Sequence, residues 1–207
     1  SWGQMYSMLI SDIKVDVVVD GETKTLSVGQ ANNLASHKDR AVRKAAFDAL
    51  ETVFTEREEF FAKTLNHLAG FRLAVYKKRG WDSVTKEPLE INRMKQETID
   101  AMWGAITSRK ATFANYLTHK ASMLGTEKLD WFDFDAPVTD STATLDYQQG
   151  AEFILKHFGR FGKEMESFAR TAFEDGWIEA EDRDNKRPGG FCTGMPLSEQ
   201  SRIFMTY

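Results

Sequence analysis

The chain has 207 residues, of which 42% are hydrophobic and 12% aromatic, enough to build the core of one large domain or slightly more. Its 27 basic and 31 acidic side chains give a net charge of −4 with both signs mixed along the chain, which argues against a dedicated nucleic-acid-binding protein. No apolar run is long enough for a membrane span, and no leader pattern opens the chain. A single cysteine favours a reducing compartment, and we expect the cytoplasm.

A β-hairpin is predicted between residues 13 and 28. Apolar residues recur at every second position, as in a strand that buries one face, at Val15, Val17 and Val19. Asp20-Gly21 is a two-residue turn signal, and residues 23–28 form the returning strand. Because an isolated hairpin is only marginally stable in water, we expect it to pack against a helix or to pair with another strand.

Helical patterns follow the hairpin. Ser27 or a neighbour caps a short helix through Ala35, and Asp39 is a suitable N-cap for a much longer helix. From residue 40 to residue 79 apolar residues recur at helical spacing without a proline, so this stretch is either one long helix or two helices with a bend. Gly70 is a weak point within the stretch, and Gly80 is expected to end it.

Three more helices are predicted after a connecting segment at residues 81–92, which contains Pro88. A long helix covers residues 95–124 and ends at Gly125. The two shorter helices cover residues 145–158 and 163–175, and Gly176 closes the second of them.

An aromatic loop, Leu129-Asp-Trp-Phe-Asp-Phe-Asp-Ala-Pro137, separates the long helix from the shorter ones. Asp133 or Asp135 could act as a carboxylate of a functional site. The structural alternative is a carboxylate that caps a helix or accepts hydrogen bonds from backbone amides in a buried turn. We favour this structural role.

The composition changes in the last twenty residues to glycine, proline, aromatic and β-forming residues. Gly189 and Gly190 allow a sharp turn or a close approach of another backbone. Residues 202–207 read as a short strand, aromatic and β-branched. The sequence stops within this predicted strand, without a turn or a cap, so we expect it to be a fragment.

Two groups of motifs carry a family resemblance. Arg187-Pro-Gly-Gly-Phe-Cys, followed by Ser201-Arg-Ile-Phe-Met-Thr-Tyr, resembles the segment before the zinc motif of oligoendopeptidase F-type metallopeptidases, which are relatives of thimet oligopeptidase. Lys78-Arg-Gly-Trp-Asp and Pro88-Leu-Glu-Ile-Asn-Arg resemble the helix-to-loop crossing of the same family. The resemblance runs from about residue 15 to Tyr207 in matching order.

The resemblance implies a zinc-dependent enzyme that cleaves short peptides in a deep cleft from which folded proteins are excluded. In such enzymes zinc polarises the scissile carbonyl and activates a water, and the glutamate of H-E-x-x-H is the general base. That motif follows the final strand in the family, so its residues would lie beyond Tyr207, and we expect the 207-residue chain to be inactive. The aromatic loop would lead into the catalytic half of the fold.

Residues of the chain itself offer weak candidates for metal binding or nucleophilic catalysis. The histidines lack the one-turn spacing of H-E-x-x-H, so we expect no zinc in this chain; they are His37, His67, His119 and His157. Cys192 could be a nucleophile with a distant histidine as base, but a small, partly buried hydrophobic role is favoured.

The glycines and the final strand provide a better functional hypothesis. A peptidase of broad specificity must hold an extended peptide chiefly by its main chain, which an exposed strand edge does. The resemblance implies that this strand borders the active-site cleft. The alternative is that Gly189 and Gly190 form only a tight turn before a strand of the core. The sequence does not favour either the peptide-binding role or this structural role. The candidate peptide-binding residues are Gly189, Gly190, Phe191, Cys192, Phe204, Met205, Thr206 and Tyr207.

The sequence therefore predicts a mainly α fold of long antiparallel helices with an N-terminal β-hairpin and a C-terminal strand, as part of a larger metallopeptidase fold. Residues 1–125 would form a helical portion and residues 126–207 the start of the catalytic domain. The expected partner is an oligopeptide, without nucleic acid or membrane, and surface left uncovered by truncation could mediate self-association. The competing hypothesis is a non-catalytic helical scaffold or interaction domain.

Overall fold

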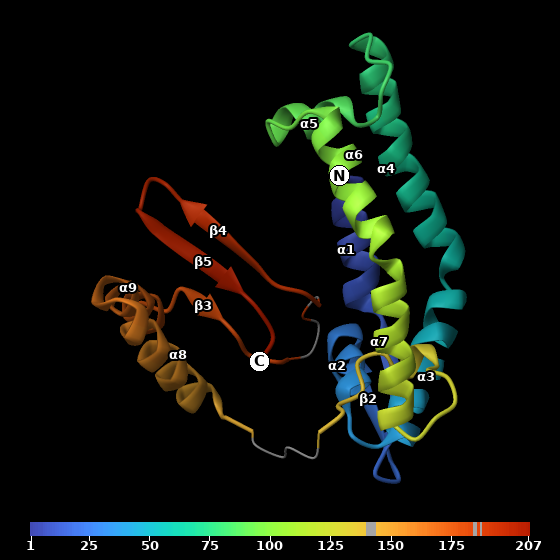
Figure 1. Cartoon of the computed structure of the whole chain (residues 1–207), viewed down its shortest axis with the longest axis vertical. Helices are drawn as coiled ribbons and strands as arrows, with labels where there is room; N and C mark the ends of the chain where they lie inside the picture. The colour runs from blue at the N-terminus through green and yellow to red at the C-terminus, as the bar shows by residue number, and fades with distance from the viewer. Residues whose placement is uncertain (140–143, 184–185, 187) are drawn as a thin grey trace.

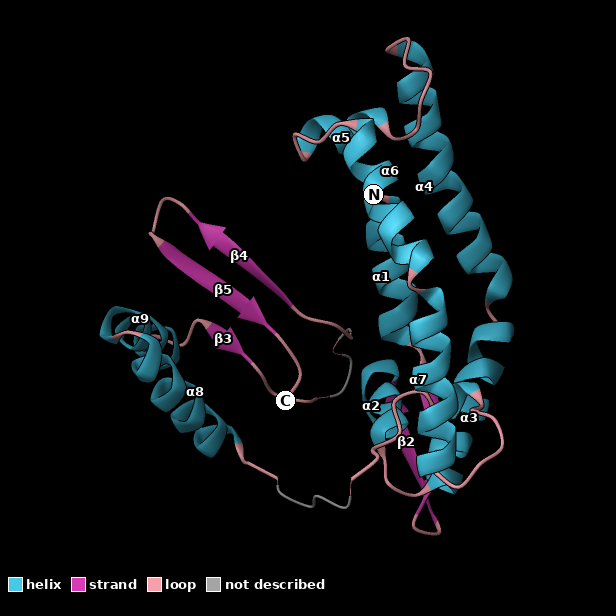
Figure 2. Ribbon diagram, in the orientation of Figure 1, coloured by secondary structure: helices cyan, strands magenta, loops and turns pink. Residues whose placement is uncertain are grey.

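A computed structural model describes residues 1–139, 144–183, 186 and 188–207. The fold is mainly helical with a β-hairpin near the N-terminus, as predicted, and the predicted C-terminal strand is one of three in a small sheet (Figure 1). Figure 2 shows the long helices aligned along one common direction, with the C-terminal helices and sheet to their left in this view.

The chain begins with helix α1 (Trp2–Asp12), which the sequence analysis missed. The Ser1 side chain accepts a hydrogen bond from the Gln4 backbone amide, and the Gln4 side chain accepts one from the Ser1 ammonium at 2.6 Å. This reciprocal pair is a capping box, which is visible in the sequence as Ser-x-x-Gln before an apolar run. The signal was present and would have predicted the helix.

The predicted hairpin is confirmed as strands β1 (Lys14–Val19) and β2 (Glu22–Ser27), which pair antiparallel from Lys14↔Ser27 to Val19↔Glu22. Asp20 and Gly21 both have positive φ, 55° and 83°, as a tight two-residue hairpin turn requires. The alternating valines of β1 face a core formed with α1 and with helix α3 (Arg40–Thr55). The hairpin therefore packs against a helix, as its small size demands.

Helix capping after the hairpin also follows the prediction. The Ser27 hydroxyl accepts a hydrogen bond from the Gln30 amide and starts α2 (Val28–Asn33), which continues as a 3-10 turn, η1 (Leu34–Ser36). The Asp39 carboxylate accepts a hydrogen bond from the Ala41 amide at 2.8 Å and starts α3. Each cap uses a backbone N–H that has no partner inside the helix.

The first long helical stretch consists of two helices, α3 and α4 (Glu58–Lys78), separated at Arg57, whose φ and ψ are −116° and 9°. Gly70 lies inside α4 without interrupting it. Gly80 follows α4 with φ +67°, the left-handed conformation that ends many helices. The connecting segment after it contains a short helix, α5 (Lys86–Ile91).

The second long stretch was predicted as one helix, and this is wrong. It consists of α6 (Gln96–Ser108) and α7 (Lys110–Met123), which meet at Arg109 with φ −104° and ψ 4°. Neither Arg57 nor Arg109 is a glycine or a proline, so the sequence carries no breaker signal at either junction. Gly125 has φ +71° just after α7, in the role predicted for it.

The C-terminal part contains helices α8 (Tyr147–Phe161) and α9 (Lys163–Glu174), close to their predicted ranges, and Gly176 follows α9 with φ +65°. Strands β3 (Ile178–Glu179), β4 (Phe191–Met195) and β5 (Gln200–Phe204) complete the chain. The segment leading to β4 passes next to α2, because a Cβ added at Gly29 would lie 3.6 Å from Pro188.

Candidate functional site

The C-terminal strands form a three-stranded sheet in the order β3-β5-β4 (Figure 1). Strand β4 pairs antiparallel with β5 from Phe191↔Phe204 to Met195↔Gln200, and β3 pairs parallel with β5. The final strand, expected to offer an exposed edge, therefore lies in the centre of the sheet. Among the described residues the outer edges of β3 and β4 have no strand partner, and β4, which was not predicted as a strand, is the longer of the two with five residues.

The two glycines before β4 differ in what they do. Gly189 has φ +94°, a conformation that is strained for any other residue. A Cβ added to Gly190 would lie 3.0 Å from the Phe204 carbonyl oxygen, so the close approach at this glycine is made by the neighbouring strand. The glycines thus allow the chain to turn and then to run tightly beside β5.

Register places the other candidate residues on two faces of the sheet. Phe191 and Phe204 are direct cross-strand neighbours, and their rings stack with centroids 5.3 Å apart. Cys192 is opposite Ile203 and, because side chains alternate along a strand, lies on the other face. The Cys192 thiol is exposed and makes no hydrogen bond to a histidine within the described part of the chain.

Residues Met205, Thr206 and Tyr207 continue the pairing beyond β5. The amide of Met205 donates to the Glu179 carbonyl and that of Tyr207 to the Ala180 carbonyl, each at 3.0 Å. The Tyr207 hydroxyl also donates to the Leu145 carbonyl at 2.9 Å, just before α8. The end of the sequence therefore joins the sheet to the first turn of α8.

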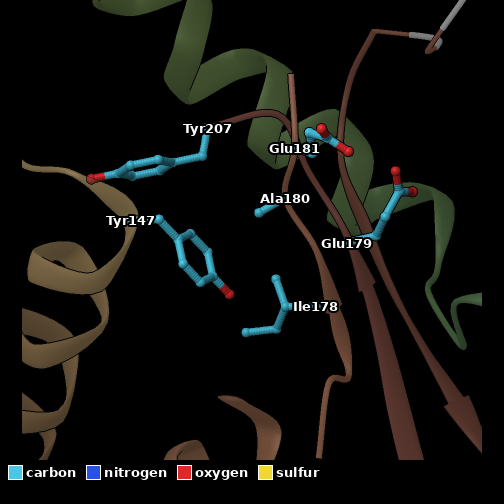
Figure 3. A pocket seen from close by; sticks show the side chains of 6 residues that line it. All are labelled: Tyr147, Ile178, Glu179, Ala180, Glu181 and Tyr207. Carbon is cyan, nitrogen blue, oxygen red and sulfur yellow. The ribbon is translucent and has the colours of Figure 1, made fainter. Parts of the chain in front are cut away.

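A cavity of about 440 Å³ opens between the start of α8 and the segment that follows β3 (Figure 3). Tyr147 and Ile178 point toward each other across it, whereas the Glu179 carboxylate points away. A second cavity of about 300 Å³, almost wholly apolar, shares Tyr147, Ile178 and Tyr207 with the first and extends between α8, α9 and β5. One face of the sheet thus borders a hollow, apolar space.

The opposite face of the sheet carries charge. Glu179 is bonded to Lys186, with its carboxylate 3.3 Å from the Lys186 ammonium, and to Arg183 at 3.0 Å. Burial alone would raise the pKa of the Glu179 carboxyl, but the hydrogen bonds and charges of Lys186 and Arg183 outweigh it and lower this pKa below its ordinary value of 4.5. Glu179 is therefore ionised at neutral pH and engaged by both cations.

The candidate carboxylate Asp133 lies outside this sheet, in the turn η2 (Trp131–Asp133), and is fully buried. It accepts hydrogen bonds from Arg40 and Arg43 of α3 and from the Asp130 backbone amide. This is the structural role that the sequence favoured, with two arginines added. Asp135 is exposed beside it.

We expect the contribution of Asp133 to stability to disappear in acid. Burial alone would raise the pKa of Asp133, but hydrogen bonds from Arg40 and Arg43 outweigh it and hold this pKa below 3.8. A lowered pKa in the folded state gives stability that is complete above the unfolded-state pKa and is lost as pH falls through the folded-state value. The difference in unfolding free energy between the wild type and Asp133→Asn should stay constant down to about pH 5 and shrink below about pH 4. A difference that widens in acid would contradict this assignment.

The four histidines are dispersed. His67 stacks on Trp2 with centroids 4.4 Å apart, His157 packs against Phe153, and His37 accepts a hydrogen bond from the Asp39 amide. His119 is exposed on α7. Within the described residues no group of three or more histidine, cysteine, aspartate or glutamate side chains is placed to hold a metal ion. The described residues therefore do not fit a catalytic zinc.

The same part of the chain contains no helix that is both long enough and apolar enough to cross a bilayer. The edge of β4 is open among the described residues, and an open strand edge can bind an extended peptide through its main chain.

Comparison with known proteins finds relatives that are peptidases. No protein-family model matches the chain. It is 27% identical over 186 residues to an oligoendopeptidase F homolog of Lactococcus lactis subsp. lactis (strain IL1403), covering 89% of this chain and 31% of that protein. It is 23% identical over 176 residues to oligopeptidase PepF of Bacillus subtilis (strain 168), covering 84% of this chain and 26% of that protein.

Solved structures share the fold over the whole chain. A protein of Bacillus anthracis str. Ames assigned as an oligoendopeptidase F superposes with a TM-score of 0.86 at 18% identity, covering 38% of that protein. PZ peptidase A, solved with an inhibitor, gives a TM-score of 0.85 at 21% identity over 37% of its chain. The resemblance found in the sequence is confirmed: the homologues of this chain are oligoendopeptidases of the F type, and the chain spans about a third of their length.

Proposed function

We propose that this chain forms one wall of the substrate cleft of a zinc-dependent oligoendopeptidase, in which the free edge of β4 holds an extended peptide. The observation that carries the proposal is the homology to oligoendopeptidases over 84–89% of the chain in the two relatives compared above. The open edge of β4 supports it, because main-chain hydrogen bonds bind a peptide whatever its side chains.

The candidate peptide-binding residues divide into three groups under this proposal. Phe191 and Cys192 lie on the edge strand itself, and Gly189 and Gly190 set its entry. Phe204 supports the edge from the centre of the sheet. Met205, Thr206 and Tyr207 lie on the opposite side of β5, where they join β3 and α8 rather than the edge.

We assign the metal ligands of such an enzyme to an H-E-x-x-H motif beyond Tyr207, as the family resemblance implies. The chain alone is then inactive, residues 126–207 belong to the catalytic domain, and residues 1–125 form the preceding helical portion. The single cysteine supports a cytoplasmic location. The substrate is a short peptide in extended conformation.

The test compares this chain with a longer one that includes any sequence encoded after Tyr207. Zinc content is measured by atomic absorption and cleavage with an internally quenched peptide. We expect only the longer chain to hold about one zinc per molecule and to cleave the peptide. Stoichiometric zinc and cleavage by the 207-residue chain would show that the metal ligands have been misplaced. Inactivity of both chains would favour the helical scaffold instead.

Exposed apolar side chains on α4, α6 and α7 support the further proposal that the isolated chain self-associates. Phe60 and Phe71 on α4 are 60% and 64% exposed, and Trp103 on α6 and Phe113 on α7 are 57% and 61% exposed. Large apolar side chains left exposed together are typical of faces covered by another protein surface. Sedimentation velocity over a range of concentrations would detect the association, and a strictly monomeric chain would exclude it.

A further inference from the structure

Lys186 is a cation buried where the ends of two strands converge. Its side chain is 3% exposed. The ammonium donates hydrogen bonds to the carbonyl oxygens of Glu181 at 2.7 Å, Met205 at 2.5 Å and Glu179 at 3.4 Å. Glu179 is the last residue of β3, Glu181 lies two residues beyond it, and Met205 directly follows β5. The Lys186 side chain thus connects the C-terminal ends of two neighbouring strands, β3 and β5.

The same ammonium is linked to the edge strand through two aromatic rings. It lies 4.7 Å from the centroid of the Phe204 ring, at a distance suited to a cation–π interaction. The Phe204 ring stacks on that of Phe191, with an angle of 12° between the ring planes. Because Phe191 is the first residue of β4, consecutive contacts lead from Lys186 to the beginning of the open edge.

Hydrogen bonds to the backbone carbonyls, rather than the ion pair, account for the position of Lys186. A lysine ammonium has three donors, and burying it is costly unless they are used. Three carbonyl oxygens lie within hydrogen-bond distance of Nζ, so each of the three donors has an acceptor. The ion pair with Glu179 involves a carboxylate that is 44% exposed, where water and salt weaken the attraction.

We propose that Lys186 is a positioning residue for the edge strand β4. It acts by holding together the C-terminal ends of β3 and β5, next to the stacked rings of Phe204 and Phe191. The inference rests on the proposed function, since the edge that Lys186 positions is the one assigned to the peptide. It adds a residue that neither the sequence motifs nor the alternation of the strands indicated. Lys186 itself touches no part of the peptide in this arrangement.

The test uses the 207-residue chain and two variants. Lys186→Met keeps most of the length and volume but removes the charge and its donors. Glu179→Gln is the matched control, because it removes the ion pair and leaves all three carbonyl contacts. Amide hydrogen exchange is followed separately in β4, in β5, and in α3 as a remote reference, and binding of a fluorescein-labelled Ala-Ala-Phe-Ala-Ala-Phe peptide is measured by anisotropy.

In Lys186→Met we expect exchange in β4 to accelerate at least about tenfold, and peptide binding to weaken to a similar degree. The amides of α3 and the Ile203 amide of β5, which donates to the Trp177 carbonyl on the side away from β4, should be nearly unchanged. Glu179→Gln should behave as the wild type. Equal effects of the two substitutions would assign the role to the ion pair and overturn the proposal. Acceleration in α3 and at the Ile203 amide as well would make Lys186 a general stabilising residue, which also overturns the proposal.

The peptide measurement separates this inference from the proposed function. If the wild type binds no peptide but β4 loosens only in Lys186→Met, the assignment of the edge to a peptide fails while the link between Lys186 and β4 stands. If the wild type binds peptide and Lys186→Met binds it equally well with unchanged exchange in β4, the proposed function survives and the positioning role is excluded.

Discussion

Replacing Asp133 by alanine is expected to lower the free energy of unfolding by about 3 kcal/mol or more, one of the two largest effects anticipated for single substitutions here. Asp133 is 0% exposed and is the carboxylate partner of Arg43, which is 3% exposed and donates to it at 3.0 Å. Alanine would leave the Arg43 guanidinium buried without its counter-charge, and this uncompensated burial costs more than the pair itself gains. Urea unfolding followed by circular dichroism measures the loss.

Asp130 provides the matched control for Asp133. Both carboxylates accept hydrogen bonds from Arg40 and they lie in the same turn, but the Asp130 side chain is 60% exposed. Because surface ion pairs contribute little, Asp130→Ala should lose only a small fraction of what Asp133→Ala loses. Similar losses in the two variants would mean that burial of the Arg43–Asp133 pair is not what stabilises the turn on α3.

A comparable loss is expected when an aspartate is introduced at Val17. Val17 is 1% exposed and lies on the face of β1 that packs against α1 and α3. An ionised carboxylate there would lack a partner, and burying it costs several kcal/mol, which approaches the whole stability of a typical domain. We expect Val17→Asp to unfold the hairpin and the helices around it at 25 °C, seen as lost α3 and β1 amide protection in hydrogen exchange.

The adjacent valine gives the control for this substitution. Val18 is 53% exposed, because neighbouring residues on a strand point to opposite faces. Val18→Asp should change the unfolding free energy by no more than about 0.5 kcal/mol. If Val18→Asp proved as damaging as Val17→Asp, the register of the hairpin would be wrong by one residue, since such a shift exchanges the two faces.

Local signals in the sequence predicted a large part of the fold. The alternating valines and Asp20-Gly21 predicted the hairpin, and Ser27 and Asp39 predicted the starts of two helices. These features depend on residues within one or two turns of each other, so no knowledge of the rest of the chain is needed. The missed α1 belongs to the same category, because its capping box was readable from Ser1 and Gln4.

Other features depend on partners far along the chain. The helices are interrupted at Arg57 and Arg109, where only the packing of the neighbouring helices distinguishes a break from a continuous helix. Asp133 is bonded to arginines ninety or more residues earlier, and such a pairing leaves no local pattern. A structural role for the carboxylate was predictable from its turn, but its partners Arg40 and Arg43 were not.

The candidate site shows the same division. Gly189 and Gly190 correctly predicted a sharp turn and a close approach of another backbone. The open edge, however, was predicted for the final strand. Strand β4 was missed because Phe191–Met195 contains a glycine and is exposed throughout, so its burial does not alternate. Strand β5 is central rather than at an edge because β3 pairs with it. Strand β3 has only two residues, and no local pattern in the sequence predicts its parallel pairing with β5.

The order of the strands in the sheet has a consequence for how this part of the chain folds. Strands β3 and β4 both precede β5 in the sequence, yet each is hydrogen-bonded to β5 and neither to the other. As the polypeptide is synthesised, β3 and β4 remain without partners until residues 200–204 are available. The sheet therefore assembles in one late step, whereas β1 and β2 can pair as soon as Ser27 has been made. Until that step, Phe191 lacks its stacking partner and the Lys186 ammonium lacks the Met205 carbonyl.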